Sequence, residues 1–350
     1  MKKTSYLWNF VLIAVITIVA LWFALKDNYQ EVVHAIGKLN GFSLTIILVW
    51  GILYTCVWGL VYVVLGRKFK KNYSVLNGIV VAFTGTFFSG ITPSATGGQF
   101  GQAYIFKKQG IAYSDGASIL WADFIIYQTT MMVYVTILFC MKFFYYSHQS
   151  AWFTLVLAGY VVNFVVIFGL YTMALFPKIY IHLSQWIVKV LSRLRILKNP
   201  EKTLESWTLQ MTSFTSEIKK LAGDKKAIVE CMLINTVRLT MLYALPFLIA
   251  RLLGIHLAMD QLVDVIALSS FVTMANSFIP IPGASGGTEM MFSILFSPIM
   301  GSLTSAVLIL WRVSTYHIIL VVGGVIFMVA KAYYDRRDAI EGKECEKPCE

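Results

Sequence analysis

The chain has 350 residues, of which 58% are hydrophobic and 13% are charged, and its mean hydropathy is +0.71. A soluble domain carries about a quarter charged residues, so this composition excludes an ordinary soluble protein and indicates a polytopic membrane protein. The formal net charge of +11 could suggest a nucleic-acid partner. The cations fall between apolar runs, however, as in loops that face an anionic leaflet, so we expect no nucleic-acid partner.

Six apolar runs are long enough to cross about 30 Å of hydrocarbon as helices. They are residues 6–25, 42–65, 115–141, 150–176, 227–253 and 302–330. The first run follows Lys2 and Lys3, as a signal peptide would, but it has no small-residue cleavage site. We therefore expect an uncleaved first span.

Two further apolar runs, 75–106 and 260–300, each contain the pattern P-x-A-S/T-G-G. We call residues 93–98 the first break and residues 282–287 the second break. Proline removes a backbone donor and glycine permits unusual conformations, so each motif is expected to interrupt its helix at membrane depth. Hydrocarbon tolerates such a break only where it lines a polar cavity or is covered by protein. Breaks at corresponding positions of two halves point to a transporter's binding site.

The distribution of lysine and arginine predicts that both broken runs are re-entrant helical hairpins. Residues 66–74 carry four of these cations and residues 178–226 carry ten. Cytoplasmic loops are enriched in lysine and arginine, and both segments are cytoplasmic only if 75–106 enters the membrane and returns. The hairpin at 260–300 then enters from the exterior, and both termini are cytoplasmic. This is the inverted repeat of secondary transporters.

The predicted fold is all-α, with about six full transmembrane helices and two re-entrant hairpins. Residues 1–335 should form a single integral membrane domain, with a first half at about 1–176 and a second half at about 227–335. Apolar residues recur at helical spacing in 178–226, which predicts two amphipathic helices on the anionic inner leaflet or over the cytoplasmic mouth. A partner-docking role for them is the alternative. Residues 336–350 should be a charged, disordered tail.

Four ionisable residues fall at membrane depth within these segments: Asp123, Arg238, Glu289 and Arg312. A buried charge is costly, so these residues either pair with one another or line a polar path for a charged headgroup. Arginine suits phosphate because its planar fork donates two parallel hydrogen bonds. Glu289 follows the second break by one turn, where the positive helix end favours a carboxylate. It could cap that end, pair with an arginine or exchange a proton.

The paired glycines of the two breaks have two interpretations. A half-helix starting at Gly97-Gly98 or Gly286-Gly287 would direct unpaired N–H groups at an anion. Alternatively, these small residues let helices pack closely. The other residues expected to contact substrate are Pro93, Thr96, Gln99, Gln102, Pro282, Gly283 and Tyr316.

No motif predicts a catalytic residue, a metal site or a cofactor. Cys345 and Cys349 lack the further ligands that a tetrahedral zinc site needs. The chain has no Walker A, HExxH or G-x-S-x-G motif and no dinucleotide fingerprint. We therefore expect that the protein is not an enzyme.

Three motifs together resemble the lysylphosphatidylglycerol synthase transmembrane family, the flippase-like membrane half of the multiple peptide resistance factor. The motifs are Thr92–Gln99, Ile281–Glu289 and Trp311–Tyr316, and the resemblance covers roughly residues 5–335. The family's P-G-x-x-G-x-x-E element falls on Pro282, Gly283, Gly286 and Glu289, and its Arg-x-x-Thr-Tyr stretch on Arg312, Thr315 and Tyr316. The chain departs from the pattern at Phe100, where many relatives have proline, and at Ala284, where a glycine is common.

The resemblance implies two re-entrant helices that meet near the midplane and the movement of a lipid between leaflets. In full-length relatives, aminoacyl transfer from tRNA to phosphatidylglycerol belongs to a separate C-terminal soluble domain, which we expect this chain to lack. We therefore expect a translocator of an anionic phospholipid or glycolipid in the bacterial inner membrane. A small-solute transporter and a membrane component of lipid modification are the alternatives. A homo-oligomer, or a soluble lipid-synthesis partner at the cytoplasmic face, stays open.

Overall fold

The computed structural model describes residues 39–92, 96–147, 150–193, 199–276 and 287–345, together with Gln30, Val33, His34 and Gly37. Within these residues the regular elements are all helices. The chain is therefore an all-α, polytopic membrane protein, as predicted. The expected first span, 6–25, lies outside the described residues.

The predicted spans and hairpins of the first half correspond to five helices. They are α3 (Gly41–Gly66), α4 (Val75–Ile91), α5 (Gly98–Lys108), α6 (Tyr113–Ser147) and α7 (Ser150–Leu175). The first break separates α4 from α5, and these two helices pack against each other.

Two helices, α8 (Pro177–Arg193) and α9 (Pro200–Ala222), occupy the predicted amphipathic segment, and the second half of the chain begins with α10 (Lys225–Leu252). The elements that follow α10 are α11 (Gln261–Asn276), α12 (Gly287–Met300), η3 (Gly301–Leu303), α13 (Thr304–Arg312), η4 (Val313–His317) and α14 (Ile318–Cys345). Helices α11 and α12 pack against each other on either side of the second break.

Four stretches of the described chain are long and apolar enough to cross a bilayer. They are Gly41–Gly66, Tyr113–Met141, Lys225–Leu252 and Gly287–Ile340. Three shorter apolar helices accompany them, at Val75–Ile91, Leu157–Thr172 and Gln261–Met274. The first arms of both expected hairpins, α4 and α11, are among these shorter helices, which agrees with helices that enter the membrane without crossing it.

Side-chain caps fix where several of these helices begin. Asn40 accepts a hydrogen bond from the Ser43 amide at 2.7 Å, at the start of α3. Ser74 caps α4 and Asp224 caps α10, and each accepts a hydrogen bond from the amide three residues later. At the other end of α5, Gly110 has a φ of +85°, a conformation that glycine adopts at low cost.

Both ends of the first hairpin lie at the same end of the bundle. Gln109, which follows α5, donates a hydrogen bond to the Asn77 carbonyl at the start of α4, at 3.1 Å, and also contacts the Tyr73 hydroxyl. Lys108 pairs at 2.8 Å with Asp335 and at 2.7 Å with Asp338 of α14. The chain therefore returns to the side from which it entered, as the charge distribution predicts. Residues 336–345 are helical as the end of α14, and the expectation that they belong to a disordered tail is wrong for this part.

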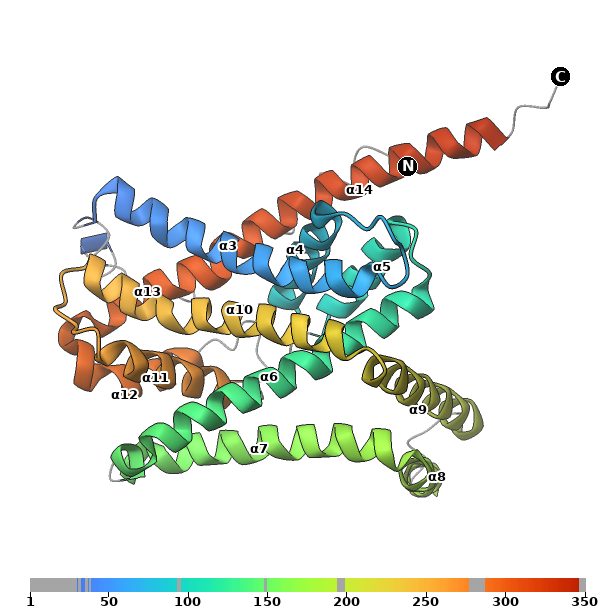
Figure 1. The fold of residues 1–350 in the computed structure, drawn as a ribbon, viewed down its shortest axis with the longest axis horizontal. Coiled ribbons are helices and arrows are strands. Elements are labelled where there is room, and N and C mark those ends of the chain that lie inside the picture. The colour runs from blue at the N-terminus through green and yellow to red at the C-terminus, as the bar shows by residue number, and fades with distance from the viewer. Residues whose placement is uncertain are drawn as a thin grey trace.

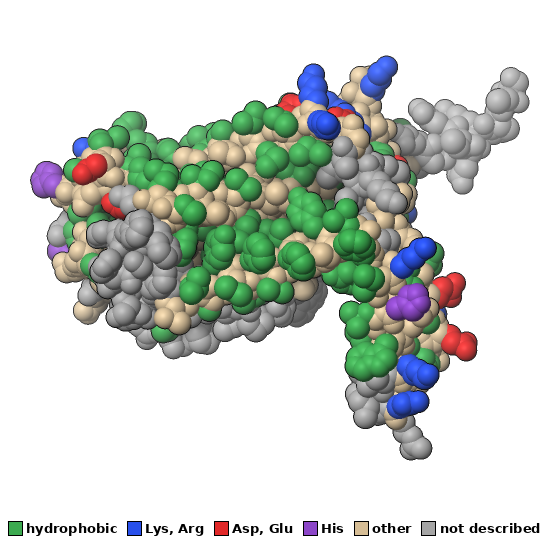
Figure 2. All heavy atoms as spheres, turned by 60° about the horizontal axis from the view of Figure 1, so that its bottom comes forward, with side chains coloured by type: hydrophobic (Ala, Val, Ile, Leu, Met, Phe, Trp, Pro, Cys, Tyr) green, Lys and Arg blue, Asp and Glu red, His purple; other side chains and the backbone are tan. Residues whose placement is uncertain are grey.

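The α11–α12 hairpin lies at the opposite end of the bundle from the α4–α5 hairpin (Figure 1). Basic side chains gather at the end that carries α8 and α9, while the visible flank of the bundle is largely apolar (Figure 2). The lysine- and arginine-rich segments thus gather at one end of the bundle.

Helix α8 presents three different faces. Ser184 and Val188 are buried, whereas Ile179, Leu183 and Trp186 form an exposed apolar face. Lys178 and Lys189 lie beside that face, and α8 packs against α7 and α9. This distribution is typical of an amphipathic helix.

Of three apolar clusters in the described part of the chain, two larger ones hold most of the helices together. One joins α10, α11, α12 and α13, and in it the Phe292 ring lies 4.2 Å from Phe296 and 5.4 Å from Trp311. The other joins α3, α4, α5 and α6 and includes Tyr62 and Phe106, whose rings lie 5.8 Å apart. The polar groups described below lie beside this second cluster.

The last span contains a π-helical turn, η4, between α13 and α14. The Ser314 carbonyl in this turn lies so close to Gly51 of α3 that a side chain at Gly51 would overlap it. Ser314 also donates a hydrogen bond to the Ile47 carbonyl. Gly51 therefore permits the close approach of α3 to a widened turn, and such turns are frequent at functional sites.

Candidate functional site

A cavity of about 690 Å³ lies beside the N-terminal part of α5, among α3, α4, α6 and α10. We call it the polar cavity. Its lining residues are Trp58, Tyr62, Ser89, Thr96, Gln99, Phe100, Gln102, Leu120, Asp123, Phe124, Tyr127 and Arg238. This volume is within the range of about 300–1,000 Å³ found for small-molecule sites.

Asp123 on α6 is the acceptor of a hydrogen-bond network that joins three helices. Its side chain is buried and accepts a hydrogen bond from the Tyr62 hydroxyl at 2.8 Å. The Trp58 indole N–H donates to the same carboxylate, 3.2 Å from its Oδ2 atom. Gln102 of α5 donates in turn to the Tyr62 hydroxyl at 2.6 Å. The network therefore ties the half-helix α5 to α3 and α6.

Arg238 on α10 makes cation–π contacts with three aromatic rings. Its guanidinium carbon lies 4.2 Å from the Trp58 ring centroid, 4.9 Å from that of Tyr127 and 5.2 Å from that of Tyr54. It donates to the Tyr54 hydroxyl at 3.2 Å and to Asn235 at 3.4 Å. Its Nε atom has no hydrogen-bond partner in the described part of the chain. Cation–π contacts thus fix a buried guanidinium and leave part of its donor capacity unused.

Asp123 and Arg238 line the same cavity, yet they form no direct ion pair within the described structure. Trp58 contacts both, because its N–H group donates to Asp123 and its ring faces Arg238. Two separated charges at membrane depth are costly, since neither has the full compensation of a direct partner. The arrangement can bind a ligand that brings complementary charge.

The glycines of the first break serve close packing. Helix α5 begins at Gly98, and the Gly97 amide already donates to the Thr92 hydroxyl at 2.9 Å. A Cβ atom on Gly98 would overlap the Ser89 hydroxyl and would lie 2.9 Å from the Gly85 carbonyl oxygen. The structure therefore favours the packing interpretation for this pair over that of free N–H donors.

The residues around those glycines form the cavity wall. Thr96, Gln99 and Gln102, which were predicted to contact substrate, all line the polar cavity together with Asp123 and Arg238. Pro93 lies outside the described residues.

Helix α12 begins at Gly287, immediately after the second break. Glu289 lies in its first turn, and its Oε1 atom is 3.2 Å from the Arg312 Nε atom. Of the roles considered for Glu289, the structure thus shows pairing with an arginine. The remaining predicted residues of the second break lie outside the described part of the chain: Pro282, Gly283 and Gly286.

Arg312 and Tyr316 connect the two hairpins. The Arg312 guanidinium carbon lies 4.9 Å from the Tyr316 ring centroid. The Tyr316 hydroxyl donates to the Gly90 carbonyl at 2.8 Å, one residue from the end of α4. A chain of contacts therefore runs from Glu289 on the second hairpin to Gly90 on the first. None of these four residues lines the polar cavity, so the predicted residues fall into two groups.

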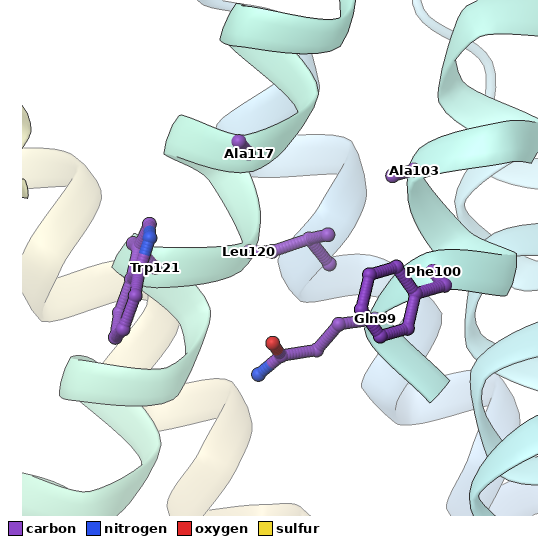
Figure 3. Close-up of a pocket in the computed structure, with 6 residues that line it drawn as sticks. All are labelled: Gln99, Phe100, Ala103, Ala117, Leu120 and Trp121. Carbon is purple, nitrogen blue, oxygen red and sulfur yellow. The ribbon is translucent and has the colours of Figure 1, made fainter. Parts of the chain in front are cut away.

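A smaller hollow of about 180 Å³ adjoins the polar cavity between α5 and α6. We call it the α5–α6 slot. Gln99, Phe100 and Ala103 of α5 line it on one side, and Ala117, Leu120 and Trp121 of α6 on the other (Figure 3). Gln99, Phe100 and Leu120 also line the polar cavity, so the two hollows share a wall.

Five residues that contact Asp123 or Arg238 were not predicted to contribute to the site: Tyr54, Trp58, Tyr62, Tyr127 and Asn235. Their spacing carries a signal, because the three aromatic residues of α3 recur every fourth position and so share one face. Tyr127 likewise follows Asp123 by four residues. Polar-tipped aromatics at helical spacing, opposite a buried charge, would have identified this wall.

The comparisons with known proteins agree with this architecture. A family model described as the lysylphosphatidylglycerol synthase TM region matches residues 9–323. No curated protein and no solved structure shows a significant match to the chain. The family match includes both breaks and all four intramembrane charges. The chain therefore belongs to the lysylphosphatidylglycerol synthase transmembrane family, as its three motifs predict.

Proposed function

We propose that this membrane protein moves an anionic phospholipid or glycolipid between the leaflets of the bacterial cytoplasmic membrane. The observation that carries the proposal is the polar cavity, in which Asp123 and Arg238 face one hollow without pairing. Charges kept apart at membrane depth have a cost that a charged ligand can offset. Family membership supports a lipid-related role.

The residues of the polar cavity have distinct roles in this proposal. Arg238 binds the headgroup phosphate, because its guanidinium lines the polar cavity and is held in place by aromatic rings. Gln99 of α5 and Thr96, which lies two residues before α5, supply hydrogen bonds. Asp123 fixes the geometry of α3 and α5 through Tyr62, and it keeps a phosphate toward Arg238 by repulsion. The protein acts as a translocator in this scheme, with no chemical change to the lipid.

The orientation in the proposal follows the charge distribution. The end of the bundle that carries Lys68, Lys108, α8 and α9 faces the cytoplasm (Figure 2). The α4–α5 hairpin then opens toward the inner leaflet and the α11–α12 hairpin toward the exterior (Figure 1).

Reconstitution of the purified protein tests the proposal. Vesicles with fluorescent phosphatidylglycerol in both leaflets are treated with an impermeant reductant, which bleaches only the outer leaflet. Protein-containing vesicles should lose more than the outer-leaflet fraction, because exchange exposes inner-leaflet lipid. Protein-free vesicles and vesicles with Arg238→Ala are the comparisons. Equal bleaching in all three, repeated with phosphatidylethanolamine and a glycolipid, would contradict lipid translocation.

A membrane component of lipid modification is the second candidate, because the family takes its name from a lipid synthase. Lipid analysis of a deletion strain separates the two. Loss of a lipid species would indicate synthesis, whereas an unchanged lipid content with an altered leaflet distribution would indicate translocation.

A further inference from the structure

The α5–α6 slot is lined mostly by apolar side chains on the flank of the bundle. Ala103, Ala117 and Leu120 form much of its wall. Phe100 is 78% exposed and Trp121 is 36% exposed, so the slot reaches the outer surface of the bundle. A large aromatic side chain exposed on the flank of a membrane protein contacts lipid chains. The slot therefore opens toward hydrocarbon.

The slot adjoins the polar cavity, and the two hollows differ in chemistry. Gln99 and Leu120 reach into the slot from the two facing helices (Figure 3). Both residues, with Phe100, also border the cavity that contains Asp123 and Arg238. An apolar hollow thus meets a charged one across a single layer of side chains. The two hollows together match an amphiphilic ligand, whose polar end would lie in the polar cavity and whose apolar end would lie in the slot.

The depth of the slot places it in one leaflet. Phe100 lies eight residues before Lys108, whose side chain pairs with Asp335 at the basic end of the bundle. At 1.5 Å per helical residue, the slot is about 12 Å from that end. A hydrocarbon core about 30 Å thick gives each leaflet roughly 15 Å. The slot therefore lies at the level of acyl chains in the leaflet next to the basic end.

We infer that the α5–α6 slot is a binding site for an acyl chain, and that a lipid enters the polar cavity sideways between these helices from the leaflet next to the basic end. This inference deepens the proposed function and rests on it, because the headgroup occupies the polar cavity. It also distinguishes a lipid from a free phosphate compound, which has no chain to place in the slot. Ala103 and Ala117 are the positioning residues, since their small side chains keep the slot open.

Filling the slot tests the inference in the reconstituted full chain. Ala117→Leu and, separately, Ala103→Leu should each slow phosphatidylglycerol exchange by about tenfold, as for an added barrier of about 1.4 kcal/mol. Ala158→Leu is the matched control, because Ala158 is an exposed alanine on α7, which does not line the slot. Exchange at the wild-type rate in both slot variants would overturn the inference.

A photolabel tests the site without relying on transport. Phosphatidylglycerol with a diazirine in one acyl chain should label residues 99–103 or 117–121 in lipid nanodiscs. An excess of unlabelled phosphatidylglycerol should compete this labelling, and Ala117→Leu should remove it. Labelling spread over the lipid-facing helices, without competition, would overturn the acyl-chain site even if exchange occurs. Competed labelling of the slot without any exchange would support the site and contradict the proposed function.

Discussion

At the first hairpin, Asp123 and Arg238 face one cavity without pairing, whereas at the second hairpin Glu289 and Arg312 lie 3.2 Å apart as a direct ion pair. Both regions follow the same sequence motif and both contain an acid and an arginine, but Asp123 is buried whereas Glu289 is partly exposed. A direct pair compensates its own charge, so it needs no ligand and can join helices. Separated charges that line a cavity are compensated only by a ligand that enters the cavity. The duplicated motif therefore does not imply two equal binding sites.

The largest expected difference between the two regions is in transport. Arg238→Ala should slow lipid exchange by about 10- to 100-fold, because a hydrogen bond to a charged group contributes about 1.5–3 kcal/mol. Arg251→Ala is the matched control, since Arg251 is an exposed arginine at the far end of the same helix, α10. The bleaching assay on vesicles measures both. A rate for Arg238→Ala equal to that of the control would remove Arg238 from the binding site.

The next comparison concerns the two acids and is measured by the free energy of unfolding in detergent. Asp123→Asn should destabilise the protein by about 2 kcal/mol, because the buried Tyr62 and Trp58 donors lose a charged acceptor. Glu289→Gln should cost about 1 kcal/mol or less, because the Glu289 side chain is 30% exposed. A larger loss of stability in Glu289→Gln than in Asp123→Asn would mean that the fold depends more on the charge at the second hairpin.

The packing role of the first break can be separated from a donor role by adding one methyl group. Gly98→Ala should destabilise the protein by about 1–3 kcal/mol, since the Gly85 carbonyl cannot move as a flexible side chain can. In α7, Gly169→Ala meets no atom within 4 Å and should be neutral or stabilising by about 0.5 kcal/mol. Thermal unfolding of the two variants measures the contrast. Equal stability would mean that α5 does not pack on α4 as described.

The link between the hairpins should give a smaller effect. Tyr316→Phe removes the hydrogen bond to the Gly90 carbonyl and should cost about 1 kcal/mol. A double-mutant cycle with Glu289→Gln measures whether the contacts act as one chain. Additive effects would show that the second hairpin is not coupled to the first through Arg312.

The smallest effect concerns the exposed pair Lys68–Asp224 at the basic end of the bundle. The hydrogen bond from Lys68, followed by that from the Ala227 amide, lowers the pKa of Asp224 below its ordinary 3.8. The contribution to stability is therefore present above pH 3.8 and is lost as the pH falls through the lowered pKa. The unfolding midpoints of the wild type and Lys68→Ala should differ slightly at pH 6 and converge in acid. A difference that persists below that range would exclude this pair as its source.

Much of the architecture follows from the sequence. Proline and paired glycine mark the breaks, and the lysine and arginine counts predict that 75–106 returns to the side it entered. Asp123 and Arg238 were identified because a charged side chain at membrane depth is costly and therefore marks an ion pair or a functional site. Their arrangement was not predictable, since Glu289 and Asp123 each had two arginines as possible partners. Only the packing of α3 between α6 and α10 places Trp58 between Asp123 and Arg238.

The aromatic wall of the polar cavity was missed for a different reason. Tyrosine and tryptophan count as apolar in a membrane segment, so Tyr62 and Trp58 look like lipid-facing or interfacial residues until their polar tips have partners. The glycines were ambiguous because close packing and anion binding require the same small residue. The contact of Gly98 with Ser89 decides between them, and no sequence pattern contains that contact.

The π-helical turn at Val313–His317 gives the last span an unusual sensitivity to length. Loss of one residue in this turn would restore ordinary α-helical hydrogen bonding. It would also rotate α13 by about 100° relative to α14. Arg312 would then swing away from Glu289 while Tyr316 kept its place beside Gly90. A change in this wide turn would alter the twist of the helix without bending its axis. The turn therefore sets the angle between the Arg312 contact with Glu289 and the Tyr316 contact with Gly90.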